Sequence, residues 1–138
     1  MNRIIGERQG DANKVLIVLI GAIHGNELEG VKAIEHILRT IDEQSLQLNG
    51  KVIGIAGNLQ AIAANRRFLD QDLNRLWTPN LKSQLQSRDA SGYSAEEEEA
   101  AELLGLLETL ANEPYERKIL IDLHTTSAEN GNFLVYPG

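Results

Sequence analysis

Short apolar runs alternate with amphipathic segments along the chain. Residues 15–20 (VLIVLI), 51–56 (KVIGIA) and 118–123 (KILIDL) are almost continuously apolar. Runs of this kind are typical of strands buried on both faces of a parallel sheet. Two weaker strands are expected near residues 3–5 and 132–136. The pattern therefore predicts a sheet whose three apolar strands are buried and parallel.

Helical periodicity occupies two of the segments between these runs. Residues 27–40 and the position after them carry apolar side chains at the spacing of a helix with one buried face: Leu28, Val31, Ile34, Leu38 and Ile41. Ser94 and Glu97 form a capping-box pattern that opens a second helix, and Pro114 ends it. A short helical stretch is expected at residues 59–64.

The alternation of strands and helices predicts an α/β fold with a mostly parallel sheet and right-handed crossovers. With 138 residues, the chain has the length of one domain. In such sheets the ligand binds beyond the carboxyl ends of the strands. His24, Asn58 and His124 each follow one of the three apolar runs, so we expect all three at one rim.

The net charge of −7 comes from a single segment, residues 91–113, which holds seven glutamates and no Lys or Arg. We expect this segment to be a solvated helix face. The excess of acidic residues gives no basic surface of the kind that binds nucleic acid or an anionic membrane. No apolar run reaches the roughly 20 residues that span a bilayer. No secretory leader pattern opens the chain, so a cytoplasmic location is expected.

The chemistry expected at the rim is that of a metal centre. His24 and Glu27 form an H-x-x-E pair, and residues three apart share one side of a helical turn. Together with His124 they offer two imidazoles and one carboxylate, which is a ligand set of catalytic zinc sites that leave a fourth position for water. The same ligands also suit other divalent ions. Either histidine alone would be an ordinary loop residue, so an α/β domain without a metal remains an alternative.

Two further features bear on this interpretation. His36 falls on the polar face of the first helix and is expected to be exposed and without a role. Residues 65–93 show no strong period and are expected to form a long loop, of the kind that is usually functional or mobile. This loop contains Arg66, Arg67 and Arg75, which suit the recognition of carboxylates but could equally form ordinary surface ion pairs.

Three motifs, in this order, resemble the succinylglutamate desuccinylase/aspartoacylase family of the zinc carboxypeptidase clan. They are HGNELEG at 24–30, RFLDQDLNR at 67–75 and DLHTTSAENG at 122–131. The resemblance implies a three-layer α/β/α fold of the zinc-exopeptidase type. It also implies that residues 1–138 correspond to the N-terminal part of the catalytic domain, with its C-terminal part absent.

The resemblance further implies roles for individual residues. One Zn²⁺ per chain would be held by three ligands: His24, Glu27 and His124. Arg67 resembles the arginine that polarises the scissile carbonyl. Asn74 and Arg75 resemble the pair that holds the substrate carboxylate, and Asp72 resembles a carboxylate that orients a zinc-bound histidine. The implied reaction is hydrolysis of the amide bond of small anionic N-acyl amino acids.

One departure from the family concerns the general base. The family's catalytic glutamate lies on a later strand, beyond Gly138, and Glu129 is a conceivable substitute in the loop after His124. The chain is therefore expected to be inactive alone if no other group takes this role. Two alternatives to the deacylase remain: a metallocarboxypeptidase acting on peptides, and a metal-binding fragment without catalysis. An unpaired sheet edge is also expected, which favours a homo-oligomer.

Overall fold

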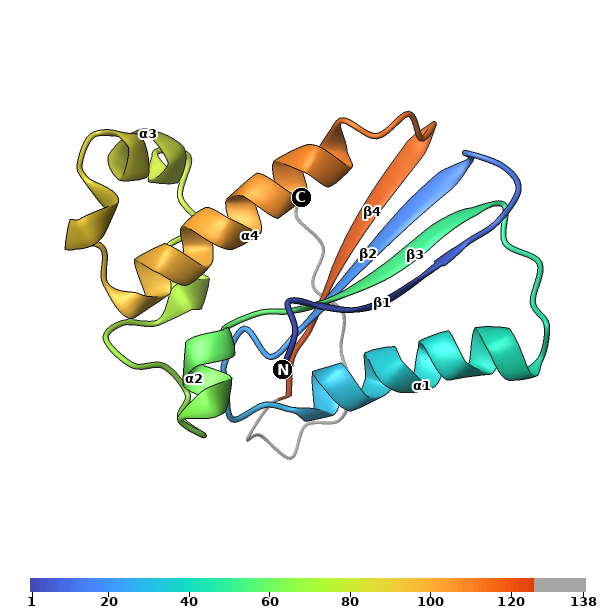
Figure 1. Ribbon diagram of the computed structural model, residues 1–138, viewed down its shortest axis with the longest axis horizontal. Coiled ribbons are helices and arrows are strands. Elements are labelled where there is room, and N and C mark those ends of the chain that lie inside the picture. The colour runs from blue at the N-terminus through green and yellow to red at the C-terminus, as the bar shows by residue number, and fades with distance from the viewer. Residues whose placement is uncertain (126–138) are drawn as a thin grey trace.

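A computed structural model describes residues 1–125, which are built around one four-stranded sheet (Figure 1). The strands are arranged in the order β1-β3-β2-β4, and their bounds are Ile4–Gln9, Val15–Gly21, Gly50–Ala56 and Arg117–Leu123 for β1 to β4. β2 pairs in parallel with both β3 and β4, which confirms the mostly parallel sheet. β1 runs antiparallel to β3 and is longer than the segment expected at residues 3–5. The strand expected at 132–136 lies outside the described residues.

Helices cover both faces of the sheet. α1 (Glu29–Glu43) lies along one face, and α4 (Ala95–Ala111) lies along the other, with α2 (Leu59–Ala63) near its N-terminal end (Figure 1). The core is correspondingly divided, because side chains alternate between the faces of each strand. The cluster on the α4 face includes Leu16, Val18 and Leu103, and the cluster on the α1 face includes Leu19 and Ile34. This arrangement confirms the three layers.

The segment expected to be a long loop contains more structure than its sequence suggested. α3 (Leu81–Gln86) and two 3-10 turns, Leu73–Arg75 and Ala90–Gly92, lie within it. Leu81 and Leu85 are four residues apart, both are buried, and both join the core on the α4 side. One helical turn is too short to produce a detectable period, which explains the error. None of the helices in residues 1–125 is long and apolar enough to cross a bilayer.

The acidic helix α4 corrects a second expectation. Its capping box forms as predicted, with Ser94 accepting from Glu97 N–H and the Glu97 side chain accepting from Ser94 N–H. Two of its glutamates are not solvated, however: Glu96 is fully buried and Glu99 is 3% exposed. Glu99 forms an ion pair with Arg3 and accepts a 2.9 Å hydrogen bond from Gln60 N–H. Part of the acidic run therefore points into the protein.

Glu96 binds the loop that follows α2. Its carboxylate accepts backbone hydrogen bonds from Leu69 (2.8 Å), Asp70 (2.9 Å) and Gln71 (3.1 Å). A fourth bond of 3.0 Å comes from the Asn58 side chain, which also caps α2 by accepting from Ala61 N–H. Burial acts to raise the pKa of Glu96, but these four bonds together hold its pKa below the ordinary value. The loop is therefore fixed around an ionised carboxylate.

Replacing Glu96 by Gln is expected to lower the free energy of unfolding by about 2 kcal/mol at neutral pH, because an amide NH₂ cannot accept the loop's N–H groups. The folded-state pKa is depressed, so the stabilisation exists above the ordinary value of 4.5 and disappears as pH falls through the folded pKa. Urea denaturation of the parent chain and of the Glu96→Gln variant across this pH range measures the difference in their free energies of unfolding. The exposed Glu98→Gln change is the control, and equal effects of both changes would contradict the assignment.

Candidate metal centre

The three parallel strands end at the same level, which brings the loops after them to one rim. Gly21, at the end of β2, is paired with Ala56 of β3 and with Leu123 of β4. His24 and His124 follow two of these ends, as predicted. Asn58 follows the third, but its side chain is taken up by α2 and Glu96, so it serves the loop rather than a ligand.

A tight turn, rather than a helix, brings His24 and Glu27 together. Glu27 N–H donates a 3.0 Å bond to the His24 carbonyl, and α1 begins only at Glu29, two residues later than predicted. Gly25 lets this turn pack directly on α2, since a Cβ there would lie 2.2 Å from the Ala61 carbonyl carbon. Gly25 N–H also donates a 3.1 Å bond to the Arg67 carbonyl, which links the turn to the loop held by Glu96.

The predicted ligands converge. The ligand atoms of His24, Glu27 and His124 all lie within 4.8 Å of one another. Nδ1 of His24 is 3.0 Å from Glu27 Oε1, and Nδ1 of His124 is 3.3 Å from Glu27 Oε2. The two imidazole centroids are 5.2 Å apart. His24 and Glu27 are buried, whereas the His124 side chain is 30% exposed, so the centre opens to solvent on the side of His124.

A second carboxylate lies behind each histidine. Nε2 of His24 is 3.0 Å from Asp72 Oδ1, and Nε2 of His124 is 2.6 Å from Asp122 Oδ2. An aspartate that accepts from Nε2–H selects the neutral tautomer whose lone pair is on Nδ1. In both histidines, Nδ1 is the nitrogen directed at Glu27. The arrangement matches the carboxylate–histidine–metal relay common in metal sites.

His24 Nδ1 supplies the test of whether a cation fits. This nitrogen is buried and has no hydrogen-bond partner among the described residues, although Glu27 Oε1 is 3.0 Å away. When Asp72 accepts from Nε2–H, the lone pair on Nδ1 faces this carboxylate oxygen, and a positive charge beside both atoms is needed to offset their repulsion. Nitrogen and oxygen ligands directed at one point meet that need with a divalent ion such as zinc. The residues present therefore fit a metal.

The pKa shifts agree with a centre built around anionic carboxylates. Burial raises the pKa of Glu27, but the 3.1 Å bond from Thr125 N–H and the two histidines outweigh it and lower the pKa overall. Asp72 behaves in the same way, with burial opposed by its bond to His24. The pKa of His124 is raised, mainly by its bond to Asp122, so a metal competes there with a proton.

Arg67 reaches the centre, whereas Asn74 and Arg75 stay at its periphery. Arg67 Nη1 donates a 2.7 Å bond to Glu27 Oε1 from a half-exposed side chain. Asn74 and Arg75 lie on the 3-10 turn directly after Asp72, and both are exposed. Asn74 N–H binds Asp72 Oδ1 at 3.0 Å, but neither side chain forms a hydrogen bond or ion pair within residues 1–125. The substrate-binding expectation for this pair is therefore untested by the structure.

Two residues that shape the centre, one in contact with it and one outside it, were missed from sequence. Asp122 lies two positions before His124, and alternation along a strand places such residues on the same face, so the D-x-H spacing was an available signal. Glu96 had no local signal, because its partners lie 25 to 38 residues away. His36 is exposed, as expected, and its Nδ1 lies 3.0 Å from Nη2 of Arg39.

Comparison with known proteins identifies relatives that match most of the chain. Residues 13–136 match the model of the succinylglutamate desuccinylase/aspartoacylase catalytic domain. A succinylglutamate desuccinylase of Pseudomonas paraeruginosa is 30% identical over 91% of this chain and 36% of its own length.

Solved structures agree with the sequence comparison. Succinylglutamate desuccinylase from Vibrio cholerae superposes with a TM-score of 0.62 at 25% identity, over 83% of this chain and 31% of that one. Murine aminoacylase 3 superposes with a TM-score of 0.60 at 29% identity, over 83% of this chain and 36% of that one. The chain spans about a third of the length of these relatives. It belongs to the succinylglutamate desuccinylase/aspartoacylase family and covers the N-terminal part of the family's catalytic domain.

Proposed function

We propose that this chain carries the metal site of a zinc-dependent hydrolase that cleaves the amide bond of N-acyl amino acids. The observation that carries the proposal is the paired geometry of the two histidines, each with an aspartate at Nε2 and with Nδ1 directed at Glu27. The names of the relatives, desuccinylases and aminoacylase, support the substrate class. The chain spans only about a third of the length of these relatives, so the hydrolase activity of the whole protein is part of the proposal.

Zn²⁺ is the proposed cofactor, held by His24, Glu27 and His124. The chain contains no cysteine, so imidazole and carboxylate are its available zinc ligands. Zinc, when bound by such a set, polarises a carbonyl group and lowers the pKa of water to about 7. Asp72 and Asp122 keep the two imidazoles in the tautomer and orientation that present Nδ1.

The arginines supply the positive charge that an anionic substrate needs. Arg67, whose Nη1 is 2.7 Å from Glu27 Oε1, would donate hydrogen bonds to the scissile carbonyl oxygen as negative charge develops on it. Arg75, exposed on the rim beside Asn74, has a free guanidinium fork within the described structure and suits a bidentate bond to the substrate carboxylate. The site would therefore bind a short anionic substrate between two arginines.

A second candidate, zinc binding without turnover, is favoured by the engagement of the nearby carboxylates. Glu27 is a proposed ligand, and the other two carboxylates in contact with the centre within residues 1–125, Asp72 and Asp122, are each bonded to a histidine. None of the three is free to take a proton from water. Glu129 lies outside the described residues, so its suitability as a base stays a hypothesis.

The zinc content of the purified chain should be about one ion per chain after equilibration and removal of excess metal. His24→Ala and His124→Ala are expected to abolish this binding, because two remaining ligands hold zinc weakly. His36→Ala is the matched control and should retain the metal. Elemental analysis gives the stoichiometry, and circular dichroism shows that the variants fold. Normal zinc content in both ligand variants would refute the assignment.

The aspartates behind the histidines should affect the affinity of the chain for zinc rather than the number of zinc ions that it binds. Asp72→Ala and Asp122→Ala are each expected to raise the Kd for zinc by roughly 10–100-fold, because the imidazole loses the partner that fixes its tautomer. Competition with a chromophoric chelator measures the change. Asp11→Ala, in the exposed turn between β1 and β2, should leave the Kd unchanged. If both variants bound zinc as tightly as the unmodified chain, the two aspartates would have no part in the metal site.

A substrate panel separates the proposed activities. The zinc-loaded chain is assayed with N-succinyl and N-acetyl amino acids and with short peptides. Deacylation that chelation abolishes and zinc restores is expected, with kcat reduced by about 10²–10³ in Arg67→Ala and KM raised in Arg75→Ala. Preference for peptides would indicate a carboxypeptidase. Zinc binding with no turnover of any substrate would favour the second candidate.

A further inference from the structure

A short loop carries two side chains of the candidate centre, and its position depends on a group outside that centre. Arg67 and Asp72 stand at the two ends of the segment 68–71, which lies outside any helix or strand. Within it, the three backbone N–H groups of residues 69–71 all donate to the carboxylate of Glu96. The backbone between the two side chains is therefore held by one buried anion.

The start of α4 holds the same loop by two further hydrogen bonds. Asp70 Oδ2 accepts a 2.9 Å bond from Ala95 N–H, and the Gln71 side chain donates a 2.8 Å bond to Ser94 Oγ. Ser94, Ala95 and Glu96 are consecutive, so the loop is attached to a single turn at the beginning of the helix. The positive end of the helix dipole lies at this turn and favours the ionised form of the Glu96 carboxylate.

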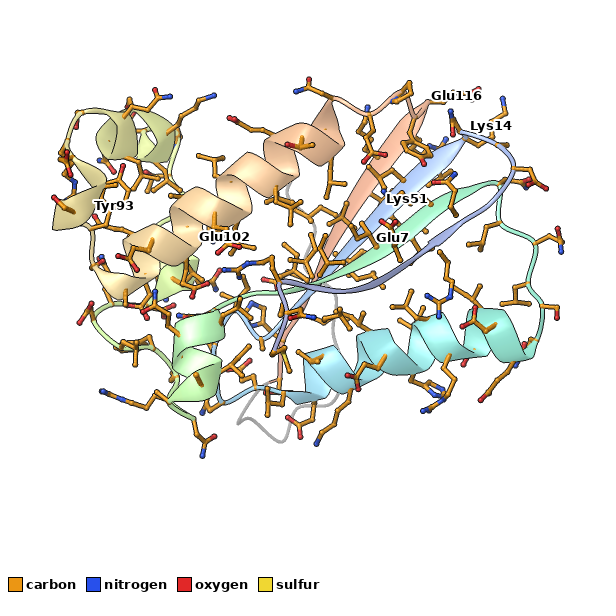
Figure 2. All side chains as sticks on the ribbon, viewed as in Figure 1. Glu7, Lys14, Lys51, Tyr93, Glu102 and Glu116 are labelled. Carbon is orange, nitrogen blue, oxygen red and sulfur yellow. The ribbon has the colours of Figure 1, made fainter. Side chains whose placement is uncertain are left out.

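The helix that carries Glu96 is itself anchored to other elements. Tyr93, directly before the helix cap, donates a hydrogen bond from its hydroxyl group to the Leu85 carbonyl of α3 (Figure 2). Further along α4, Glu102 accepts a 2.8 Å bond from Arg3 (Figure 2). The same arginine donates a 2.8 Å bond to a carbonyl at the end of β3. A helix fixed in this way makes the Glu96 carboxylate a fixed reference point for the loop.

The contacts that this loop makes with the centre tolerate little movement. Asp72 Oδ1 is 3.0 Å from His24 Nε2, and Arg67 Nη1 is 2.7 Å from Glu27 Oε1. Because a hydrogen bond is lost beyond roughly 3.5 Å, a displacement of the loop by about 0.5 Å would break the contact with His24. The Arg67 side chain is long and can adjust to such a shift, whereas the short Asp72 side chain follows its backbone. The contact of Asp72 is therefore the one that depends most on the loop.

We propose that Glu96 is a positioning residue of the metal site: through the backbone of residues 69–71 it keeps the Asp72 carboxylate at Nε2 of His24. The inference rests on the proposed function, in which His24 is a zinc ligand. Both carboxylate oxygens are needed, because Oε1 accepts from the Asn58 side chain and one loop N–H, and Oε2 accepts from two loop N–H groups. A glutamine keeps one oxygen and turns an NH₂ group toward two donors, so at least one bond to the loop is lost.

Zinc affinities of two matched variants test the inference. Glu96→Gln should raise the Kd for zinc about tenfold, the lower end of the range for losing a partner of a metal-bound histidine. Glu99→Gln is the control, because Glu99 is also buried on α4 but binds Arg3 and Gln60 instead of the loop. Its Kd should equal that of the parent chain, measured by competition with a chromophoric chelator.

The outcomes separate this inference from the proposed function. A parent chain that binds no zinc would overturn the proposed function, and the inference with it. A parent chain that binds zinc no more tightly than Glu96→Gln, or an equal rise of Kd in Glu96→Gln and Glu99→Gln, would overturn the inference alone. Circular dichroism shows that each variant is folded under the conditions of the titration.

A double-mutant cycle tests the route through Asp72. In a chain that already carries Asp72→Ala, the further change Glu96→Gln should raise the Kd for zinc no more, because the contact that Glu96 maintains is already gone. A general loss of stability would act independently of Asp72. Increases in Kd that multiply in the double variant would therefore contradict the positioning role.

NMR of the metal-free chain tests the same contact without zinc and with a milder variant. Gln71→Ala keeps the Glu96 carboxylate and removes one bond between the loop and α4, so its fold is not at risk. The Nε2–H proton of His24, hydrogen-bonded to a carboxylate in the parent chain, should move upfield in Glu96→Gln and by a smaller amount in Gln71→Ala. Gln84→Ala on the exposed side of α3 is the control and should leave it in place. A His24 signal unchanged in both loop variants would overturn the inference.

Discussion

The buried carboxylate of Glu27 is the charge around which the loops at the rim are arranged. A buried anion is unfavourable unless positive charge and hydrogen-bond donors surround it. Here Oε1 accepts from Arg67 and faces His24, while Oε2 accepts from Thr125 N–H and contacts His124. These partners come from the loops after β2, α2 and β4. Segments distant in sequence are thus joined at one carboxylate, which is also where a metal would bind.

A second buried carboxylate supports the first from outside the site. Glu96 holds the backbone of residues 69–71, the stretch between Arg67 and Asp72. Both side chains therefore reach the centre from a segment that has no regular secondary structure of its own. Pairing an irregular loop with a buried, ionised acceptor gives the loop the rigidity that a site requires. The acidic helix α4 is in this sense part of the site, although none of its residues contacts the ligands.

Much of the fold and the convergence of His24, Glu27 and His124 could be predicted from the sequence, because both depend on local patterns. The apolar runs located β2, β3 and β4, and His24 and His124 followed from the rule that parallel strands end at one rim. The burial of Glu96 and the short helix α3 could not be predicted, since the first depends on distant partners and the second on a single turn. By charge alone the glutamates of α4 form one group, whereas the structure separates them into buried and exposed side chains according to the face of the helix they occupy.

The central claim is that two imidazoles, each held by an aspartate at Nε2, present Nδ1 to a metal bound by Glu27. Long-range ¹H–¹⁵N NMR of the histidine side chains during zinc titration tests it most directly, because the nitrogen shifts report which atom carries the proton and which binds the metal. We expect zinc to shift Nδ1 of His24 and His124 while Nε2 keeps its proton, and to leave His36 unchanged. Binding through Nε2, or no change at either histidine, would contradict the account.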